Sequence, residues 1–191
     1  MSNLAKQYPN GYKEKLPTEM IGGVIYAMAP VRFTHQKTER NIHNIFDRHL
    51  KGKSCEAVHD MYLSLSDEDL FIPDIMIICN RDYIESARVV GPPDLVVEIL
   101  SRSTKKRDKT LKKDTYEKFG VKEYWLVDAD GRDMEVYVLI DGKYKLDGVY
   151  TVYDEFDLEE LAEQGLEPVY EFKTSIFDDL IIKIEDVFEG L

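Results

Sequence analysis

GPPDLVVEILSRST, residues 91–104, has the pattern of a buried β-strand. An apolar run from Leu95 to Leu100 lies between Gly-Pro-Pro and Ser-Arg-Ser-Thr, and such boundaries are typical of a strand. Glu98 interrupts this run. Because a carboxylate loses its hydration when it is buried, Glu98 needs a compensating partner. The strand therefore predicts either a bound cation or a buried base beside Glu98.

A second apolar stretch, FIPDIMII at residues 71–78, carries Asp74 near its start. Strands that follow one another along the chain are often neighbours in a sheet. If these two strands pair, Asp74 and Glu98 meet on one face and share either a proton or a cation. Oxygen ligands suit Mg²⁺, and Mn²⁺ is the other candidate. Asp94 has the same strand parity as Glu98, but it lies about 13 Å away along the strand.

The segment that follows, residues 104–120, predicts a helix that carries many lysines. Asp108, Lys112 and Tyr116 are spaced four residues apart, so they share one face of this helix. Lys112 is therefore the lysine expected to point toward the sheet. A simpler alternative is a buried ion pair between Lys112 and Glu98 without any metal.

The remaining pattern predicts an α/β domain with a mixed sheet, and the length of 191 residues predicts one domain, 1–191. The other expected elements are a strand that follows a Gly-Gly bend within 20–30, a helix at 32–50, a strand at 55–65, a turn at 66–70, a strand at 71–80, a loop with a short helix at 80–93, a strand at 122–130, β-hairpins at 131–152, a short helix at 157–165, and a final strand with an amphipathic turn at 178–191.

The net charge of −12 argues against nucleic acid as a partner, because phosphate binding rests on Lys and Arg. The charge is unevenly distributed, however. Residues 154–171 carry eight acids and no Lys or Arg, whereas residues 102–113 carry seven basic residues and one Asp. The sequence therefore predicts a basic patch directly after the strand that contains Glu98.

Other features limit the class of protein. The sequence has no apolar run of about 18 residues, which predicts no membrane span, and its N-terminus lacks an apolar signal core. We therefore expect a cytoplasmic protein in which Cys55 and Cys79 are buried free thiols. The histidines at 43, 49 and 59 show no metal-ligand spacing.

The stretches FIPDIMII and GPPDLVVEILSRSTKKRDKTLKKDTYEKFGVKEYWLVDAD (91–130) closely resemble the Uma2-like family, which is grouped with the PD-(D/E)XK nucleases. The resemblance extends upstream to GGVIYAMAP and the histidine that follows it, and downstream to IFDDLIIKIEDVF. It covers most of the chain. It implies a restriction-endonuclease-like core, in which a central mixed β-sheet is flanked by helices and extended by β-hairpin strands.

The same resemblance implies an endonuclease that uses Mg²⁺ or Mn²⁺ to hydrolyse DNA. Asp74 and Glu98 take the positions of the family's metal-binding acids, and the Ile99 carbonyl is the expected third ligand. Leu100 stands where the superfamily usually has a lysine. In the Uma2-like pattern a lysine of the following helix, here Lys112, takes its place, so Lys112 is the third expected catalytic residue.

Further residues are expected near this site. His35, Asp94 and Tyr116 are expected to line it or to support its ligands, although a lone histidine is more often a packing residue. The residues expected to contact the DNA backbone are Arg102, Lys105, Lys106, Arg107 and Lys109.

Two other functional classes stay open. A catalytically inactive nuclease fold that binds nucleic acid or a partner protein would explain Leu100 and the acidic net charge. A glycoside hydrolase also needs paired carboxylates, but a chain with a single Trp offers little platform for a sugar. We also expect a homodimer, because cutting both strands of a duplex favours two sites, and the hairpins at 133–152 are the expected interface.

Overall fold

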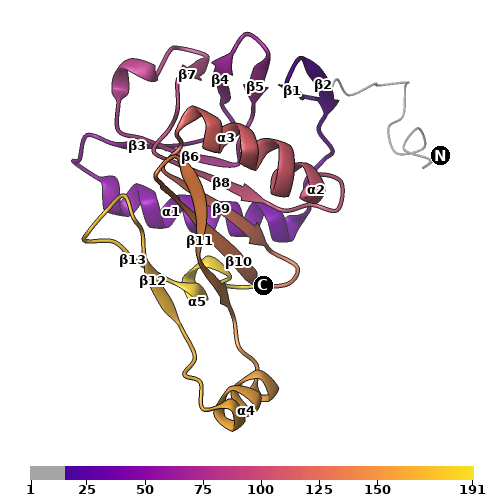
Figure 1. The fold of residues 1–191 in the computed structure, drawn as a ribbon. Coiled ribbons are helices and arrows are strands. Elements are labelled where there is room, and N and C mark those ends of the chain that lie inside the picture. The colour runs from indigo at the N-terminus through magenta and orange to yellow at the C-terminus, as the bar shows by residue number, and fades with distance from the viewer. Residues whose placement is uncertain (1–15) are drawn as a thin grey trace, which may run out of the picture.

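The computed structural model describes residues 16–191, and Figure 1 shows their arrangement. At its centre lies a six-stranded sheet in the order β11-β10-β9-β8-β6-β3. Strands β8 and β9 are parallel and every other neighbouring pair is antiparallel, which confirms the predicted mixed sheet. The strands are β3 (Glu56–His59), β6 (Ile75–Ile78), β8 (Leu95–Ile99), β9 (Glu123–Asp128), β10 (Asp133–Ile140) and β11 (Lys143–Thr151).

A helical crossover joins the two parallel strands, as parallel pairing requires. It runs through α2 (Lys105–Arg107), the π-helical turn η3 (Asp108–Lys112) and α3 (Lys113–Phe119). The helix ends at Gly120, whose left-handed backbone (φ 84°) suits a residue without a Cβ. The predicted helix at 104–120 is confirmed, with a π turn that the sequence pattern did not indicate.

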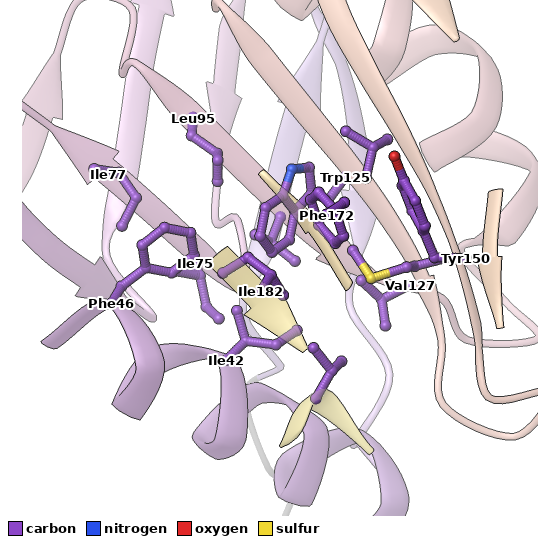
Figure 2. Packing of buried hydrophobic residues seen from close by; sticks show 14 of the residues in the cluster. Ile42, Phe46, Ile75, Ile77, Leu95, Trp125, Val127, Tyr150, Phe172 and Ile182 are labelled. Atoms are coloured by element: carbon purple, nitrogen blue, oxygen red, sulfur yellow. The ribbon is translucent and has the colours of Figure 1, made fainter. Parts of the chain in front are cut away.

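Two apolar layers cover the two faces of the central sheet. On one face, Ile42 and Phe46 of α1 (Phe33–Leu50) pack against strand residues such as Ile75 and Trp125 (Figure 2). On the other face, Tyr116 of α3 packs in a second cluster of buried side chains. Because side chains alternate along a strand, consecutive apolar residues in β6 and β8 supply both layers. This explains why these strands are apolar throughout.

A second, five-stranded sheet has the order β2-β1-β5-β4-β7. Its strands are β1 (Thr18–Ile21), β2 (Val24–Ala27), β4 (Tyr62–Ser66), β5 (Asp69–Phe71) and β7 (Arg88–Val90), and the short 3-10 helix η2 (Arg81–Tyr83) precedes β7. The strand expected after a Gly-Gly bend within 20–30 is confirmed as β2, which follows the turn at Gly22 and Gly23. β1, which ends at Ile21 before the turn, pairs with it to form a hairpin that the sequence pattern did not indicate.

The boundaries of two expected strands were wrong. The strand at 55–65 is divided between the two sheets, because Asp60 adopts a positive φ of 52° and redirects the chain between β3 and β4. The stretch at 71–80 also divides: Phe71 ends β5 and Ile75 begins β6. Pro73, which lacks an N–H group, lies in the break. This break places Asp74 immediately before β6.

The C-terminal part adds a small hairpin of β12 (Glu171–Lys173) and β13 (Ile181–Lys183), followed by α5 (Ile184–Val187). Between β11 and β12, α4 (Glu155–Gln164) projects from the body of the molecule (Figure 1), and none of its residues is buried. A capping box starts α4 at Asp154, so the helix begins before the predicted range of 157–165.

Cys55 and Cys79 form a disulfide, so the expectation of free thiols was wrong. Cys55 directly precedes β3 and Cys79 directly follows β6, and these strands pair with Glu56 opposite Ile78. The two cysteines are therefore cross-strand neighbours. Their separation of 24 residues in the sequence does not reveal this register. No helix within residues 16–191 is both long and apolar enough to cross a membrane.

Glu123 of β9 connects the C-terminal hairpin to the central sheet. Its side chain is fully buried and accepts hydrogen bonds from the Trp125 indole (2.6 Å) and the Ser175 backbone N–H (2.6 Å). Glu123→Ala would leave the buried Trp125 N–H without an acceptor and would remove the bonds to Ser175, and we expect it to lower the free energy of unfolding by about 2 kcal/mol. Urea denaturation measures this loss. Glu163→Ala on exposed α4 is the control, and equal stability of the two variants would contradict the expectation.

Candidate active site

The two predicted acids face each other across neighbouring strands. β6 and β8 pair with Ile75 opposite Val97, so the next position in the same register sets Asp74 opposite Glu98. Residues opposite each other in an antiparallel pair lie on the same face of the sheet. Both acids line a cavity of about 240 Å³, and Ile99, His35 and Lys112 line it as well. The structure thus brings the expected metal ligands and the expected lysine together.

Glu98 is only 4% exposed, and two side chains of the crossover helix contact it. Lys112 Nζ lies 3.0 Å from one carboxylate oxygen, and the Tyr116 hydroxyl donates to the other at 2.9 Å. Burial raises the pKa of Glu98 well above its ordinary value, and the charge of Lys112 opposes this rise. Lys112 is thus a buried base beside Glu98. A buried base is one of the two ways in which the charge of Glu98 was expected to be compensated.

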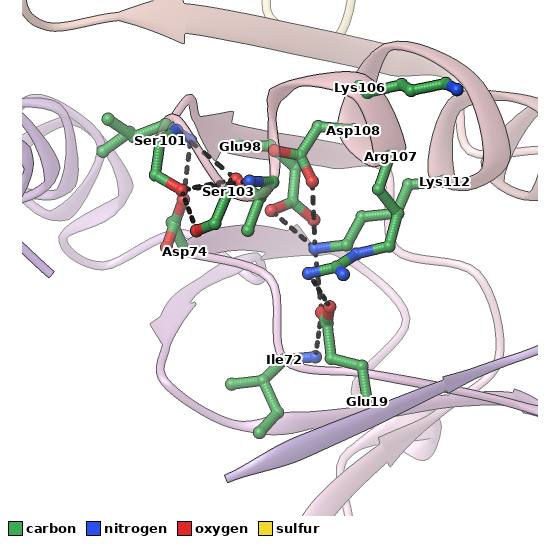
Figure 3. A network of polar contacts seen from close by, with 12 residues as sticks. Glu19, Ile72, Asp74, Glu98, Ser101, Ser103, Lys106, Arg107, Asp108 and Lys112 are labelled. Carbon is green, nitrogen blue, oxygen red and sulfur yellow. Dashed lines mark hydrogen bonds and ion pairs between the residues drawn. The ribbon is translucent and has the colours of Figure 1, made fainter. Parts of the chain in front are cut away.

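Lys112 lies at the centre of a group of buried acids, as Figure 3 shows. Its Nζ is 2.8 Å from Glu19, 3.0 Å from Glu98 and 3.5 Å from Asp108. Burial alone would lower the pKa of Lys112, but these three carboxylates outweigh it and raise the pKa above its usual value. Both Asp108 and Lys112 belong to the π turn η3, a distortion that is frequent at functional sites.

Glu19 is a site residue that the sequence analysis missed. It lies on β1 of the second sheet and is 1% exposed. One of its oxygens accepts the Ile72 backbone N–H at 3.1 Å and also contacts Lys112, whereas the other lies 3.6 Å from Arg107 Nη2. The available signal was an acid within the short strand TEMI, the same kind of signal that identified Glu98.

Asp74 is held at the start of β6 by two contacts. Its Oδ2 accepts the Ile99 backbone N–H at 2.6 Å and lies 3.4 Å from His35 Nε2. Burial acts to lower the pKa of His35, but the hydrogen bond to Asp74 and the charge of Asp74 raise it above its ordinary value. The other ring nitrogen of His35, Nδ1, is buried and has no hydrogen-bond partner among residues 16–191.

A profile described as "Uma2: Putative restriction endonuclease" matches residues 5–173. The chain belongs to the Uma2 family. The uncharacterized protein slr1290 of Synechocystis sp. is 28% identical over 122 residues, which cover 62% of this chain and 64% of that protein. The match therefore spans less than two thirds of that relative.

A crystal structure from Anabaena variabilis, described as a "putative nuclease belonging to DUF820", superposes with a TM-score of 0.67. The superposition covers 96% of this chain and 94% of the other, at 20% sequence identity. At this identity the likeness concerns the fold, and it supports the restriction-endonuclease-like core.

Leu100 remains the departure from the usual nuclease motif in this Uma2 chain. Its backbone N–H donates to Val127 at 2.7 Å, and its side chain packs against the apolar cluster that contains Tyr116. The amine instead comes from Lys112, which approaches Glu98 from the crossover helix.

Asp94 lies away from the two other predicted acids. Asp94 lies at the opposite end of β8 from Glu98, where it accepts the Cys79 backbone N–H at 2.8 Å and pairs with Lys122 at 2.6 Å. It does not line the cavity that contains Asp74. The alternation of side chains gave the correct face of the sheet, but four residues of an extended strand separate Asp94 from Glu98.

The predicted basic residues divide into three groups. Arg107 points inward, with its side chain 13% exposed, toward Glu19 and the Tyr26 ring, a position that does not favour its predicted contact with DNA. Two others form ion pairs, Lys105 with Asp128 and Lys109 with Glu135. Arg102 at the edge of the cavity and Lys106 on the helix are exposed.

Proposed function

We propose that this Uma2 protein hydrolyses DNA phosphodiester bonds with a divalent ion, Mg²⁺ or Mn²⁺, held by Asp74, Glu98 and the Ile99 carbonyl. One observation carries the proposal. Asp74 and Glu98 lie opposite each other in a single cavity, and the buried Lys112 is 3.0 Å from Glu98. Paired acids with an adjacent amine supply ligands for a hard ion and a group that stabilises developing negative charge.

The charges around the cavity support a cation. The buried and half-buried acids of this region, Glu19, Asp74, Glu98 and Asp108, outnumber the adjacent bases Lys112 and Arg107. Carboxylate oxygens and a backbone carbonyl form the donor set that Mg²⁺ prefers. His35 adds a buried nitrogen without a partner at the same cavity.

A divalent ion bound here would lower the pKa of a water molecule and polarise the phosphate. The residues of the chain would orient the reactants around it. Asp74 keeps its position through the Ile99 N–H, and Lys112 lies where it would stabilise charge that develops on the phosphate. Arg102 at the edge of the cavity would contact the DNA backbone.

A second candidate function is a nuclease fold that only binds nucleic acid or a protein. One observation favours it: both oxygens of Glu98 already have partners, in Lys112 and Tyr116. An ion pair of this kind can satisfy a buried carboxylate without a metal.

A cleavage assay separates the two functions. Supercoiled, linear and single-stranded DNA are incubated with the protein and Mg²⁺ or Mn²⁺, with and without a chelator. A nuclease produces metal-dependent nicks or breaks that the chelator abolishes. Binding of these DNAs without cleavage in either metal would instead favour the binding module.

The exposed basic residues give a separate test of DNA contact. Arg102→Ala and Lys106→Ala are each expected to weaken DNA binding and to reduce by about one the slope of log affinity against log salt concentration. The control, Lys118→Ala, removes an exposed lysine near the far end of the same helical segment. Fluorescence anisotropy at several salt concentrations measures the slopes, and unchanged slopes for both variants would contradict the predicted contact.

A cytoplasmic location and a homodimer stay predictions. The disulfide between Cys55 and Cys79 is a bond that reducing compartments seldom maintain. Reaction of the protein with a thiol reagent, before and after reduction, shows which state the purified chain carries.

A further inference from the structure

A second group of potential metal ligands lies outside the cavity of Asp74 and Glu98. Glu39 of α1 meets His59 at the end of β3 and the adjacent Asp60. The ligand atoms of these three residues all lie within 4.8 Å of one another. They line a separate hollow of about 360 Å³.

The spacing of these atoms matches that of metal ligands. His59 Nδ1 lies 3.2 Å from Glu39 Oε1 and 3.5 Å from Asp60 Oδ2. Ligands of a tetrahedral zinc ion, bound at about 2.0–2.2 Å, are separated by about 3.3–3.6 Å from one another. Both distances from His59 Nδ1 are thus close to the separations in such a site, and the two carboxylates lie within 4.8 Å of each other.

A second histidine, His43, lies beside this group, although it is outside the set of ligand atoms that lie within 4.8 Å of one another. His43 follows Glu39 by four residues on α1, so both side chains lie on the same face of the helix. The rings of His43 and His59 have their centroids 4.7 Å apart, and His43 lines the same hollow. Arg40 also lines it and opposes a cation, but the two carboxylates outnumber that charge.

We infer that Glu39, His59 and Asp60, with His43 as a further donor, form a binding site for a divalent transition metal, with Zn²⁺ as the best match. Imidazole together with carboxylate favours zinc over Mg²⁺, which prefers oxygen ligands alone. The site is separate from the proposed Mg²⁺ site and does not depend on nuclease activity. A bound ion would join α1 to the corner between β3 and β4.

The position of the site suggests what this link does. Glu39 lies one helical turn after His35, and His35 contacts Asp74 at 3.4 Å. A metal that fixes α1 against the corner at Asp60 would therefore also fix the histidine beside the proposed catalytic aspartate. The metal is expected to raise the melting temperature of the folded chain as its concentration rises.

The test is a titration with Co²⁺, whose visible absorption becomes strong in tetrahedral coordination, followed by competition with Zn²⁺. It is made in the Asp74→Asn variant, so that the other proposed metal site does not contribute. We expect one equivalent of Co²⁺ to bind with a strong visible band, and Zn²⁺ to displace it. His59→Gln and Asp60→Asn should each weaken binding at least about tenfold.

The variants suit this test because both residues are exposed enough to replace. The side chains of His59 and Asp60 are 51% and 76% exposed, and Asn accepts the positive φ of Asp60. His49→Gln, on the same helix but outside the hollow, is the control and should bind as tightly as its parent. Failure of Co²⁺ to develop the band, or binding that His59→Gln and Asp60→Asn leave unchanged, would overturn the proposal and leave His59 as an ion-pair partner of Glu39.

Discussion

Asp74→Asn should lower the rate of DNA cleavage at least about 100-fold while the protein stays folded. The substitution removes the negative charge that the proposed ion requires. It keeps a side-chain oxygen that can accept the Ile99 N–H, so the start of β6 should hold its position. The rate is measured on plasmid DNA at saturating Mn²⁺, and circular dichroism verifies the fold.

Asp94→Asn is the matched control for this variant. Asp94 is also an aspartate that accepts a backbone N–H beside β8, but it lies at the other end of the strand and outside the cavity. Its replacement should leave the cleavage rate within about twofold of wild type, because Asn keeps an oxygen that can accept the Cys79 N–H and the side chain does not line the cavity. Asp74→Asn cleaving DNA as fast as Asp94→Asn would contradict the role assigned to Asp74.

Lys112→Met should lower the free energy of unfolding by about 3–5 kcal/mol, because removal of one partner from a buried ion pair leaves uncompensated charge. Lys112 is 2% exposed and contacts Glu19, Glu98 and Asp108, so three carboxylates lose their nearest positive charge. Equilibrium unfolding in urea measures the loss.

The control for this variant is Lys118→Met on the same helix, where the lysine is exposed. It should change stability little. Combining Lys112→Met with Glu98→Gln should recover part of the lost stability, because it removes one of the unpaired charges. A Lys112→Met protein as stable as Lys118→Met would show that the acids around Lys112 are protonated or solvated instead of paired with it.

The fold and the centre of the site were predictable from local patterns. β6 and β8 are apolar runs that each carry or adjoin one acid, and consecutive strands often pair, so the meeting of Asp74 and Glu98 could be expected. The four-residue spacing of Asp108, Lys112 and Tyr116 placed them on one helix face, and the structure buries all three.

The parts that sequence patterns missed depend on contacts between distant segments. Glu19 reaches Lys112 from the second sheet, and nothing near position 19 indicates that β1 lies over the crossover helix. The inward position of Arg107 is a similar case, because a run of basic residues does not show which member points toward the core. The disulfide depends on strand register, which local periodicity does not fix.

The central claim is that a divalent ion, in addition to Lys112, compensates Asp74 and Glu98. The most direct test is calorimetric titration of Mn²⁺ into the His59→Gln variant, which removes a ligand of the other proposed site. We predict saturable binding that Asp74→Asn and Glu98→Gln each weaken at least about tenfold. Binding that neither substitution changes, or no binding in the presence of DNA, would contradict the claim and leave Glu98 balanced by Lys112 alone.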